Sequence, residues 1–156
     1  MGVLVRRAGR RDLEAIHGLW QELRELEAKA GTGERLGIRA DDLAREHREL
    51  ILADPRTAIL VAEEQGRVLG YAHAQIETND PVYLPERFGI LVDLTVCADR
   101  RREKIGSRLF EACREWLTSR GVAELRVHAP VSAEQAQRFF ESVGCQARRV
   151  ESRLAL

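Results

Sequence analysis

Residues 91–120 constrain the fold most, because they read as a strand, a charged turn and a helix in direct succession. Residues 91–97 form an apolar run of strand length, and residues 98–104 form a charged turn. After the turn, apolar side chains recur at helical intervals, at Ile105, Leu109, Cys113, Trp116 and Leu117. The sequence therefore predicts a strand–turn–helix unit.

The turn of this unit is rich in cations, with Arg100, Arg101, Arg102 and Lys104. Gly106 follows, at a place where the first amides of the predicted helix would point out of its end. Free amides, the positive end of a helix and cationic side chains together favour anionic oxygens. The turn is a candidate anion site, and the alternative is a solvated basic turn in front of a core helix.

The composition fits one domain that spans residues 1–156, long enough to bury roughly 70% of its unfolded surface. Lys plus Arg equals Asp plus Glu, at 25 each, so the basic turn is a local feature and no nucleic-acid partner is expected. There is no apolar run of membrane-spanning length and no secretory leader pattern, so we expect a cytoplasmic protein without a membrane partner. The cysteines and histidines lack the paired spacings of a metal site, so no metal is predicted.

The other elements are predicted from periodicity and turn residues. Residues 3–5 suit an edge strand, and amphipathic helices are expected over residues 12–29 and from residue 41 or 42 to residue 53. In the second helix, the residues placed on the buried face are Leu43, His47, Leu50 and Ile51. His47 is thus interpreted as a packed histidine.

Residues 57–64 and 68–77 predict a hairpin, in which Gly70 marks a bulge. One face of its second strand carries Tyr71, His73, Gln75 and Glu77. Residues 78–88 read as a loop, either an ordinary surface loop or a lid beside a substrate. Further strands are expected over residues 123–128 and within 145–156, and a capping box at residues 132–135 opens a helix that runs through residue 142. This order favours an α+β sheet with helices on both faces.

The charged turn resembles motif A of the GCN5-related N-acetyltransferase (GNAT) family, in which Arg/Gln-x-x-Gly-x-Gly/Ala binds the pyrophosphate of acetyl-coenzyme A. Anchored on Gly106, the pattern falls on residues 101–106, with Lys104 where the first glycine is usual. The preceding Asp-Leu-Thr-Val at residues 93–96 resembles the strand ending of that family. Downstream, Ala136, Phe139 and Gly144 match a second family motif. In that motif Ala133, Phe140 and Cys145 stand for the usual Asn, Tyr and Phe.

The resemblance covers nearly the whole chain and implies a mixed, mostly antiparallel sheet that splays between its fourth and fifth strands, here residues 91–97 and 123–128. Pantetheine would enter that gap along the backbones of Leu94, Thr95 and Val96, with the Val96 amide polarising the thioester carbonyl. Phe139 would border the cofactor. The residues that would hold the pyrophosphate are Arg101, Arg102, Glu103, Lys104, Ile105, Gly106 and Ser107.

The chemistry implied by the resemblance is direct transfer of the acetyl group to a primary amine of a small molecule or peptide. Asp93 and Glu77 are the candidate bases, although Asp93 equally fits a contact with a helix layer. With Asp80 and Glu86, these carboxylates would favour a cationic amine. Phe140 supplies no proton for the leaving thiolate. The alternative reading is an acyl-coenzyme A-binding sensor or interaction module without turnover, and a homodimer is left open.

Overall fold

In the computed structural model, the described residues are 2–129 and 133–156. Within them the chain forms a single sheet from five strands, which are β1 (Leu4–Arg7), β2 (Thr57–Glu64), β3 (Arg67–Thr78), β4 (Arg87–Val96) and β5 (Leu125–Val127). The α-helices of the same residues are α1 (Leu13–Ala30), α2 (Ala40–Ile51), α3 (Ile105–Ser119) and α4 (Glu134–Ser142). Short 3-10 helices, η1 (Arg10–Asp12) and η2 (Ala98–Arg100), precede α1 and α3.

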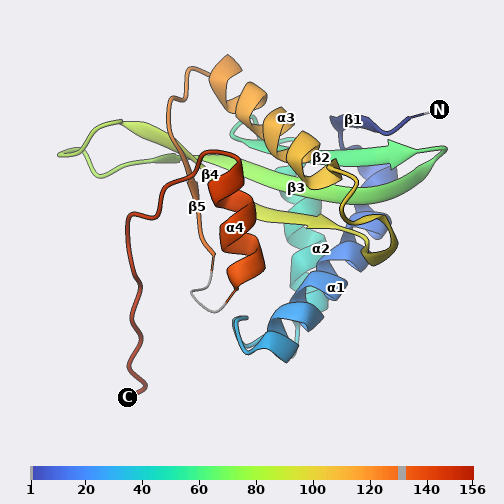
Figure 1. The fold of residues 1–156 in the computed structure, drawn as a ribbon, viewed down its shortest axis with the longest axis horizontal. Helices are drawn as coiled ribbons and strands as arrows, with labels where there is room; N and C mark the ends of the chain where they lie inside the picture. Colours follow the sequence, from blue (N-terminus) through green and yellow to red (C-terminus); the bar gives the residue numbers. More distant parts are fainter. Residues whose placement is uncertain (1, 130–132) are drawn as a thin grey trace.

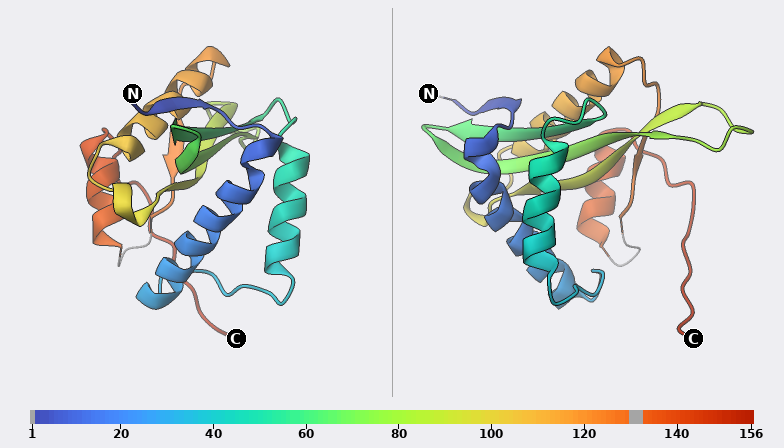
Figure 2. Two further views of the ribbon diagram at one scale, coloured as in Figure 1. Left: turned by 90° about the vertical axis from the view of Figure 1, so that its right-hand side faces the viewer. Right: turned by 180° about the vertical axis from the view of Figure 1, so that it is seen from behind.

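The helices lie on both faces of the sheet (Figures 1 and 2). α1 and α2 cover one face, and α3 covers the other with α4 beside it. Because both faces are covered, the first six residues of β2 are all buried. The hydrophobic core lies on both sides of the sheet. Ile16 and Leu19 of α1 pack on one side, and Leu109, Phe110 and Cys113 of α3 pack on the other.

The strands are ordered β1-β2-β3-β4-β5, and all neighbours are antiparallel except β4 and β5, which are parallel. β5 pairs with β4 only from Gly89 to Leu91, whereas β4 continues to Val96. The two strands therefore part over the second half of β4. The α+β class, the mostly antiparallel sheet and the splay between the fourth and fifth strands are confirmed.

Two register shifts shape the sheet near this gap. In β4, Leu91 pairs with Ala74 and Asp93 pairs with His73, so Val92 is an extra residue. In β3 the extra residue lies next to Gly70, as predicted. A Cβ at Gly70 would lie 2.7 Å from the carbonyl oxygen of Thr95, so a glycine is needed where β3 passes β4 this closely.

Some predicted boundaries were wrong. β4 begins at Arg87 and not at residue 91, because its first residues continue the ladder with β3, so the predicted loop at 78–88 is shorter. No strand forms within residues 145–156, all described, where most side chains are exposed. This tail runs away from the sheet (Figure 1). Ser132 of the predicted capping box lies outside the described residues, and Ala133 is the N-cap of α4.

The buried face of α2 also differs from the prediction. Leu43 and Leu50 are 51% and 77% exposed, and His47 is exposed as well. The buried residue of this helix is Arg48, at 7% exposure. Its guanidinium lies over the indole ring of Trp20 on α1, 5.1 Å from the ring centroid. Of the predicted face, Ile51 alone is partly buried and packs against the core. Because an arginine can bury its stem and stack its planar head, the hydrophobic pattern missed Arg48 and placed the other three residues inside wrongly.

Candidate active site

The edge of β4 that faces β5 is open over its last residues. The Cys97 amide donates to the carbonyl of Leu69 at 2.7 Å, on the β3 side. Because backbone groups alternate along a strand, the amides of Leu94 and Val96 point to the other side, into the gap between β4 and β5. These two donors lie where an extended amide chain can add to a sheet edge.

One of the four turn cations is engaged within the protein. Arg100 bonds to Glu64 at 2.7 Å and to Glu103 at 2.6 Å, and these two carboxylates raise its pKa. The pair with Glu64 ties the turn after β4 to the end of β2, and the pair with Glu103 lies within the turn itself. Arg100 therefore positions the turn, and its charge is already balanced.

The other three cations of the turn remain available. Arg101, Arg102 and Lys104 are exposed, and none of them forms an ion pair with another described residue. Arg101 donates from Nε to the carbonyl of Val96 at 3.2 Å, which holds its stem against the open end of β4. The turn therefore presents three free positive charges beside the gap.

The N-terminus of α3 is equally open. Lys104 is its N-cap residue, no side chain caps the helix, and no acidic residue lies in its first turn. A Cβ at Gly106 would lie 3.8 Å from the Phe139 ring and 3.9 Å from Val96, which is ordinary van der Waals contact. Phe139 thus lies next to Gly106. The uncapped amides and the free cations fit the pyrophosphate of acetyl-coenzyme A.

We predict opposite effects on stability and binding for Lys104→Gly. Lys104 has a φ of 61°, which costs a residue with a Cβ roughly 1–2 kcal/mol. A glycine removes that cost but loses about 0.5–1 kcal/mol through its more flexible unfolded chain. We expect the variant to be more stable by up to ~1 kcal/mol in urea unfolding. Acetyl-coenzyme A should bind more weakly to it, with a smaller salt dependence, in calorimetry. Tighter binding would show that strain outweighs charge.

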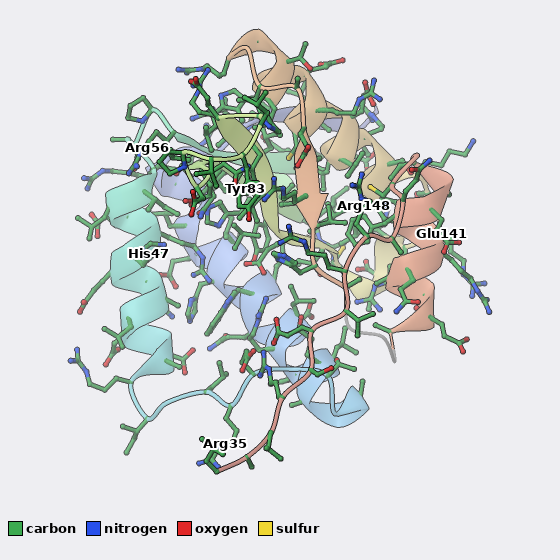
Figure 3. All side chains as sticks on the ribbon, turned by 90° about the vertical axis from the view of Figure 1, so that its left-hand side faces the viewer. Arg35, His47, Arg56, Tyr83, Glu141 and Arg148 are labelled. Atoms are coloured by element: carbon green, nitrogen blue, oxygen red, sulfur yellow. The ribbon has the colours of Figure 1, made fainter. Side chains whose placement is uncertain are left out.

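A cavity of about 280 Å³ lies on the opposite face of the sheet, where α1 and α2 pack on β3 and β4. Figure 3 shows one of its residues, His47, on α2. Its lining mixes polar and apolar side chains, and it consists of Trp20, Arg24, Ala44, His47, Arg48, His73, Gln75, Val92 and Asp93. This cavity reaches β4 at Val92 and Asp93, just before Leu94.

Asp93 lies on β4 and lines the cavity, one residue before the open part of the strand edge. Its side chain is 10% exposed, and it accepts hydrogen bonds from Arg24 Nη2 at 2.5 Å and from the Tyr71 hydroxyl at 2.9 Å. Burial raises the pKa of Asp93, while the Arg24 charge and the Tyr71 hydrogen bond act in the opposite direction. Asp93 therefore faces a helix layer and the cavity at once. A buried carboxylate with a raised pKa suits a general base.

Glu77 does not line the cavity beside Asp93. It accepts a hydrogen bond from Gln75 Nε2. Four residues separate it from His73 along β3, which is about 13 Å of strand. The shared face of Tyr71, His73, Gln75 and Glu77 is as predicted, but it extends past the cavity. Among the two candidate bases, the geometry favours Asp93.

The four carboxylates predicted near the acceptor are not brought together at the cavity, which only Asp93 lines. Asp80 and Glu86 are exposed on the loop between β3 and β4, which projects from one end of the sheet (Figure 1). No residue of this loop lines the cavity, so the reading as a lid gains no support. The charges that do line the cavity are those of two arginines and one aspartate.

Phe140, which stands where the resembled motif has a tyrosine, packs against other aromatic rings. The Phe140 ring lies 6.3 Å from that of Phe110 and 5.4 Å from that of Phe139, measured between centroids. The two tyrosines of the chain lie elsewhere. Tyr71 is bonded to Asp93, and Tyr83 is exposed on the loop after β3 (Figure 3). Neither one replaces the hydroxyl that Phe140 lacks on α4.

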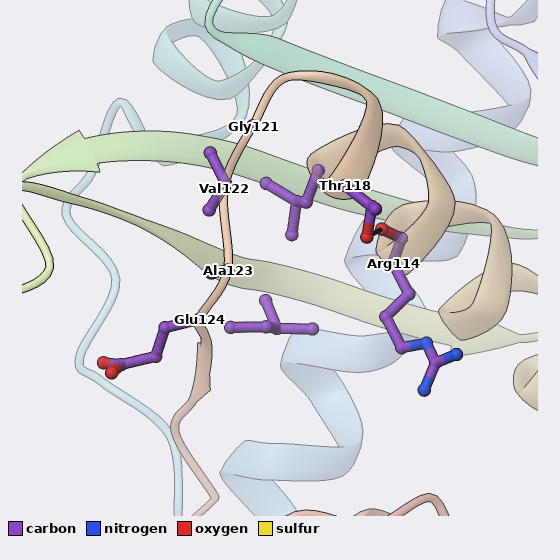
Figure 4. A pocket seen from close by; sticks show the side chains of 8 residues that line it. Arg114, Thr118, Gly121, Val122, Ala123 and Glu124 are labelled. Atoms are coloured by element: carbon purple, nitrogen blue, oxygen red, sulfur yellow. Dashed lines mark hydrogen bonds between the residues drawn. The ribbon is translucent and has the colours of Figure 1, made fainter.

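A second cavity, of about 360 Å³, lies between the C-terminal end of α3 and the approach to β5 (Figure 4). It is lined by Arg114, Leu117, Thr118, Gly121, Val122, Ala123, Glu124 and Leu125. α3 has 15 residues, so this cavity lies about 20 Å from the N-terminus of that helix. It is separate from the motif turn and from Asp93.

Three residues that shape the candidate site were missed from the sequence. Arg24 and Arg48 were not singled out, and His73 was only assigned to a strand face. Sequence spacing gave no signal for them, because Arg24 lies 69 positions from its partner Asp93. An arginine within reach of a buried stripe, as at Arg48, is the only hint that the sequence offers.

Within the part of the chain that the structure describes, no helix combines the length and apolarity needed to cross a membrane. In the same residues, His, Cys, Asp and Glu side chains do not gather in a group of three or more that could hold a metal ion.

The sequence matches the model of the acetyltransferase (GNAT) family over residues 20–145. The chain therefore belongs to the acetyltransferase (GNAT) family and is an N-acetyltransferase. The predicted family, fold class and enzyme class are confirmed. No curated protein sequence matches the chain at a significant level.

Solved structures with the same fold cover nearly the whole chain. The aminoglycoside N-acetyltransferase AAC(6')-Iy, in complex with a bisubstrate analogue, CoA-S-monomethyl-acetylneamine, is 19% identical, covers 100% of both chains and has a TM-score of 0.80. A predicted acetyltransferase from Clostridium acetobutylicum with acetyl-CoA is 16% identical over 99% of this chain and 96% of its own, with a TM-score of 0.79. A GCN5-related N-acetyltransferase from Ralstonia eutropha is 22% identical over 99% of each chain, with a TM-score of 0.77. Acetyl-coenzyme A as the cosubstrate agrees with these complexes.

Proposed function

We propose that the chain transfers an acetyl group from acetyl-coenzyme A directly to a primary amine of a small molecule, with Asp93 as the general base. The observation that carries this proposal is Asp93 itself, which lines the cavity between α1, α2 and the sheet one residue before Leu94, whose amide faces the gap. The AAC(6')-Iy complex contains an analogue that joins coenzyme A to an acetylneamine, which supports small amines as acceptors for this fold. The three free cysteines, two of them buried, suit a reducing compartment, so the cytoplasm is part of the proposal.

The proposed reaction has one bond-forming and one bond-breaking event. The neutral amine nitrogen attacks the thioester carbonyl carbon, and the C–S bond breaks as the electron pair returns to sulfur. The Val96 amide donates to the carbonyl oxygen as it becomes negative. Asp93 takes the proton that the ammonium form must lose before attack, directly or through a water, and the second proton leaves the nitrogen as the amide forms, which balances the proton that the thiolate takes up. The products are an N-acetyl amide and coenzyme A.

Removing a proton from the ammonium form of the acceptor costs more free energy than releasing coenzyme A as an unprotonated thiolate. An amine of pKa ~10.4 is neutral in about one molecule in a thousand near pH 7.4, which corresponds to roughly 4 kcal/mol. A thiol of pKa ~8.5 costs only about 1.4 kcal/mol to leave as thiolate near pH 7.5. A base is therefore the larger need, and the lack of an acid at Phe140 is tolerable.

Phe140→Tyr should therefore raise turnover by tenfold or less, because the thiolate costs only about 1.4 kcal/mol. Turnover of the natural protein should rise from about pH 7 to 9 as amine and thiolate become easier to accommodate. Both results can be read from thiol release with one accepted amine. A gain of several hundredfold in the variant would show that an acid matters far more, and would favour the sensor reading.

The experiment that tests the proposed function is thiol release from acetyl-coenzyme A across a panel of amines and peptides. Binding of acetyl-coenzyme A by calorimetry runs in parallel. Binding without thiol release for any acceptor would support the sensor or interaction module instead. Detection of the N-acetyl product by mass spectrometry excludes simple hydrolysis of the thioester as the source of thiol.

A further inference from the structure

Arg48 is a buried cation without an anionic partner. It is 7% exposed, and it forms no ion pair with any carboxylate of the described residues. Its Nη1 donates to Nδ1 of His17 at 2.9 Å. An arginine only donates, so His17 Nδ1 is the acceptor, and its Nε2 proton is donated to Asp41 at 3.1 Å. Burial lowers the pKa of His17, which agrees with a neutral ring. Arg48 is thus held in place by neutral groups.

His73 supplies a second unsatisfied group in the same cavity. It is 6% exposed, and its buried Nε2 atom has no hydrogen-bond partner. Burial, followed by the charges of His47 and Arg48, lowers its pKa to about 4, so the ring is neutral near pH 7. A buried polar atom without a partner is costly unless a ligand or water meets it. Both His73 and Arg48 line the cavity.

Of the two arginines that line the cavity, only Arg48 has no ion-pair partner among the described residues. Arg24 is paired with Asp93 at 2.5 Å and with Glu27, which does not line the cavity, at 3.2 Å, so the charge of Arg24 is balanced. His73 is neutral, for the reason given above. Arg48 then stands alone as a fixed cation whose planar head is stacked on Trp20 at 5.1 Å. One positive charge with a planar fork matches a carboxylate better than a dianionic phosphate or a cation.

We propose that the acceptor is a small amine that also carries a carboxylate, such as an amino acid, and that Arg48 and His73 bind this carboxylate. This assignment rests on the proposed acetyltransferase function of the same cavity. The carboxylate would fill the Arg48 end, and the amine would lie toward Asp93. A polycationic acceptor would place positive charge against Arg48 and is therefore disfavoured. The volume of about 280 Å³ is near the lower limit for ligand pockets, which suits a small acceptor.

The test compares acceptors in pairs that differ only by carboxylate or carboxamide. The pairs are α-amino acids and 4-aminobutanoate, each with its amide. With the natural protein, kcat/KM for thiol release should be at least about tenfold higher for the carboxylate of an accepted pair. Equal use of both members, or preference for the amide, would overturn the assignment while leaving the acetyltransferase function intact.

Variants on α2 separate recognition from folding. Arg48→Met should remove the carboxylate preference, and Arg48→Lys, which keeps the charge without the fork, should keep part of it. Arg45→Gln is the matched control, because Arg45 lies one turn earlier on the same helix, is paired with Glu14 and does not line the cavity. The control should keep the full preference. Equal selectivity in Arg48→Met and the natural protein, with normal thermal unfolding in both, would exclude Arg48.

A binding measurement decides the case in which no amine is acetylated. The probes are acetate, butanoate and 3-phenylpropanoate, each compared with its amide by the shift in melting temperature. A shift with a carboxylate in the natural protein that is lost in Arg48→Met and in His73→Phe would support the anion site although the proposed function had failed. If no carboxylate shifts the melting temperature and no carboxylate-bearing amine is acetylated, the anion site is refuted.

Discussion

Gly106→Asp should abolish the binding of acetyl-coenzyme A while leaving the fold intact. The new carboxylate would stand at the uncapped N-terminus of α3, where the pyrophosphate is expected. Two unit charges about 4 Å apart near a protein surface repel by about 4 kcal/mol. The affinity should therefore fall by several hundredfold or more. Calorimetry with acetyl-coenzyme A measures the loss.

The structure explains why this variant should fold. A Cβ at Gly106 meets only ordinary contacts, at 3.8 Å from Phe139 and 3.9 Å from Val96. An acidic residue in the first turn of a helix is also favourable to its dipole. Gly106→Asn has the same size without the charge and should lose far less affinity, which separates bulk from repulsion. Equal affinity in Gly106→Asp and the natural protein would place the pyrophosphate elsewhere.

The motif half of the site could be predicted from sequence because it is local. The turn, the start of α3 and the glycine at position 106 lie within a few residues of one another, so their spacing is preserved in the fold. Lys104 stands where the motif usually has a glycine, and its φ of 61° lies in the left-handed region that favours glycine. Arg100 shows the limit, since its pair with Glu64 joins residues 36 positions apart.

The acceptor half could not be predicted because it is assembled from distant segments. Asp93 meets Arg24 of α1 across 69 positions, and Arg48 of α2 meets His17 across 31. On α2, hydrophobicity placed Leu43 and Leu50 inside, whereas the structure leaves both exposed and buries Arg48. Hydrophobic periodicity assigns a face only when apolar side chains fill the space under the helix. Here Trp20 and a guanidinium fill it.

The second large effect is expected for Asp93→Asn, which removes the proposed proton acceptor at nearly constant shape. A positioned general base contributes about 10²–10⁴-fold to the rate, so turnover should fall by at least about a hundredfold with a saturating acceptor. The amide oxygen of asparagine can still accept from Arg24 or Tyr71, so the local fold should survive. Affinity for acetyl-coenzyme A should change little, because the turn after β4, where the pyrophosphate is expected, does not include Asp93.

Glu77→Gln gives the matched comparison for the second carboxylate. Glu77 lies outside the cavity, so its loss should reduce turnover far less than the loss of Asp93. If Glu77→Gln causes the larger fall, the base must be assigned to Glu77. If both variants keep normal turnover, solvent takes the proton, and neither carboxylate is catalytic.

Tyr71→Phe tests whether Asp93 acts through its titration and not only through its packing. The Tyr71 hydroxyl donates to Asp93 at 2.9 Å, and this hydrogen bond lowers the pKa of Asp93 against the effect of burial. Without the hydroxyl, the pKa of Asp93 should rise further, so a higher pH is needed before the carboxylate can accept a proton. The acidic limb of kcat should therefore move to higher pH, while the maximal rate at alkaline pH stays close to that of the natural protein. A uniform fall in kcat at every pH, with no displacement of that limb, would mean that Tyr71 and Asp93 only hold α1 against the sheet.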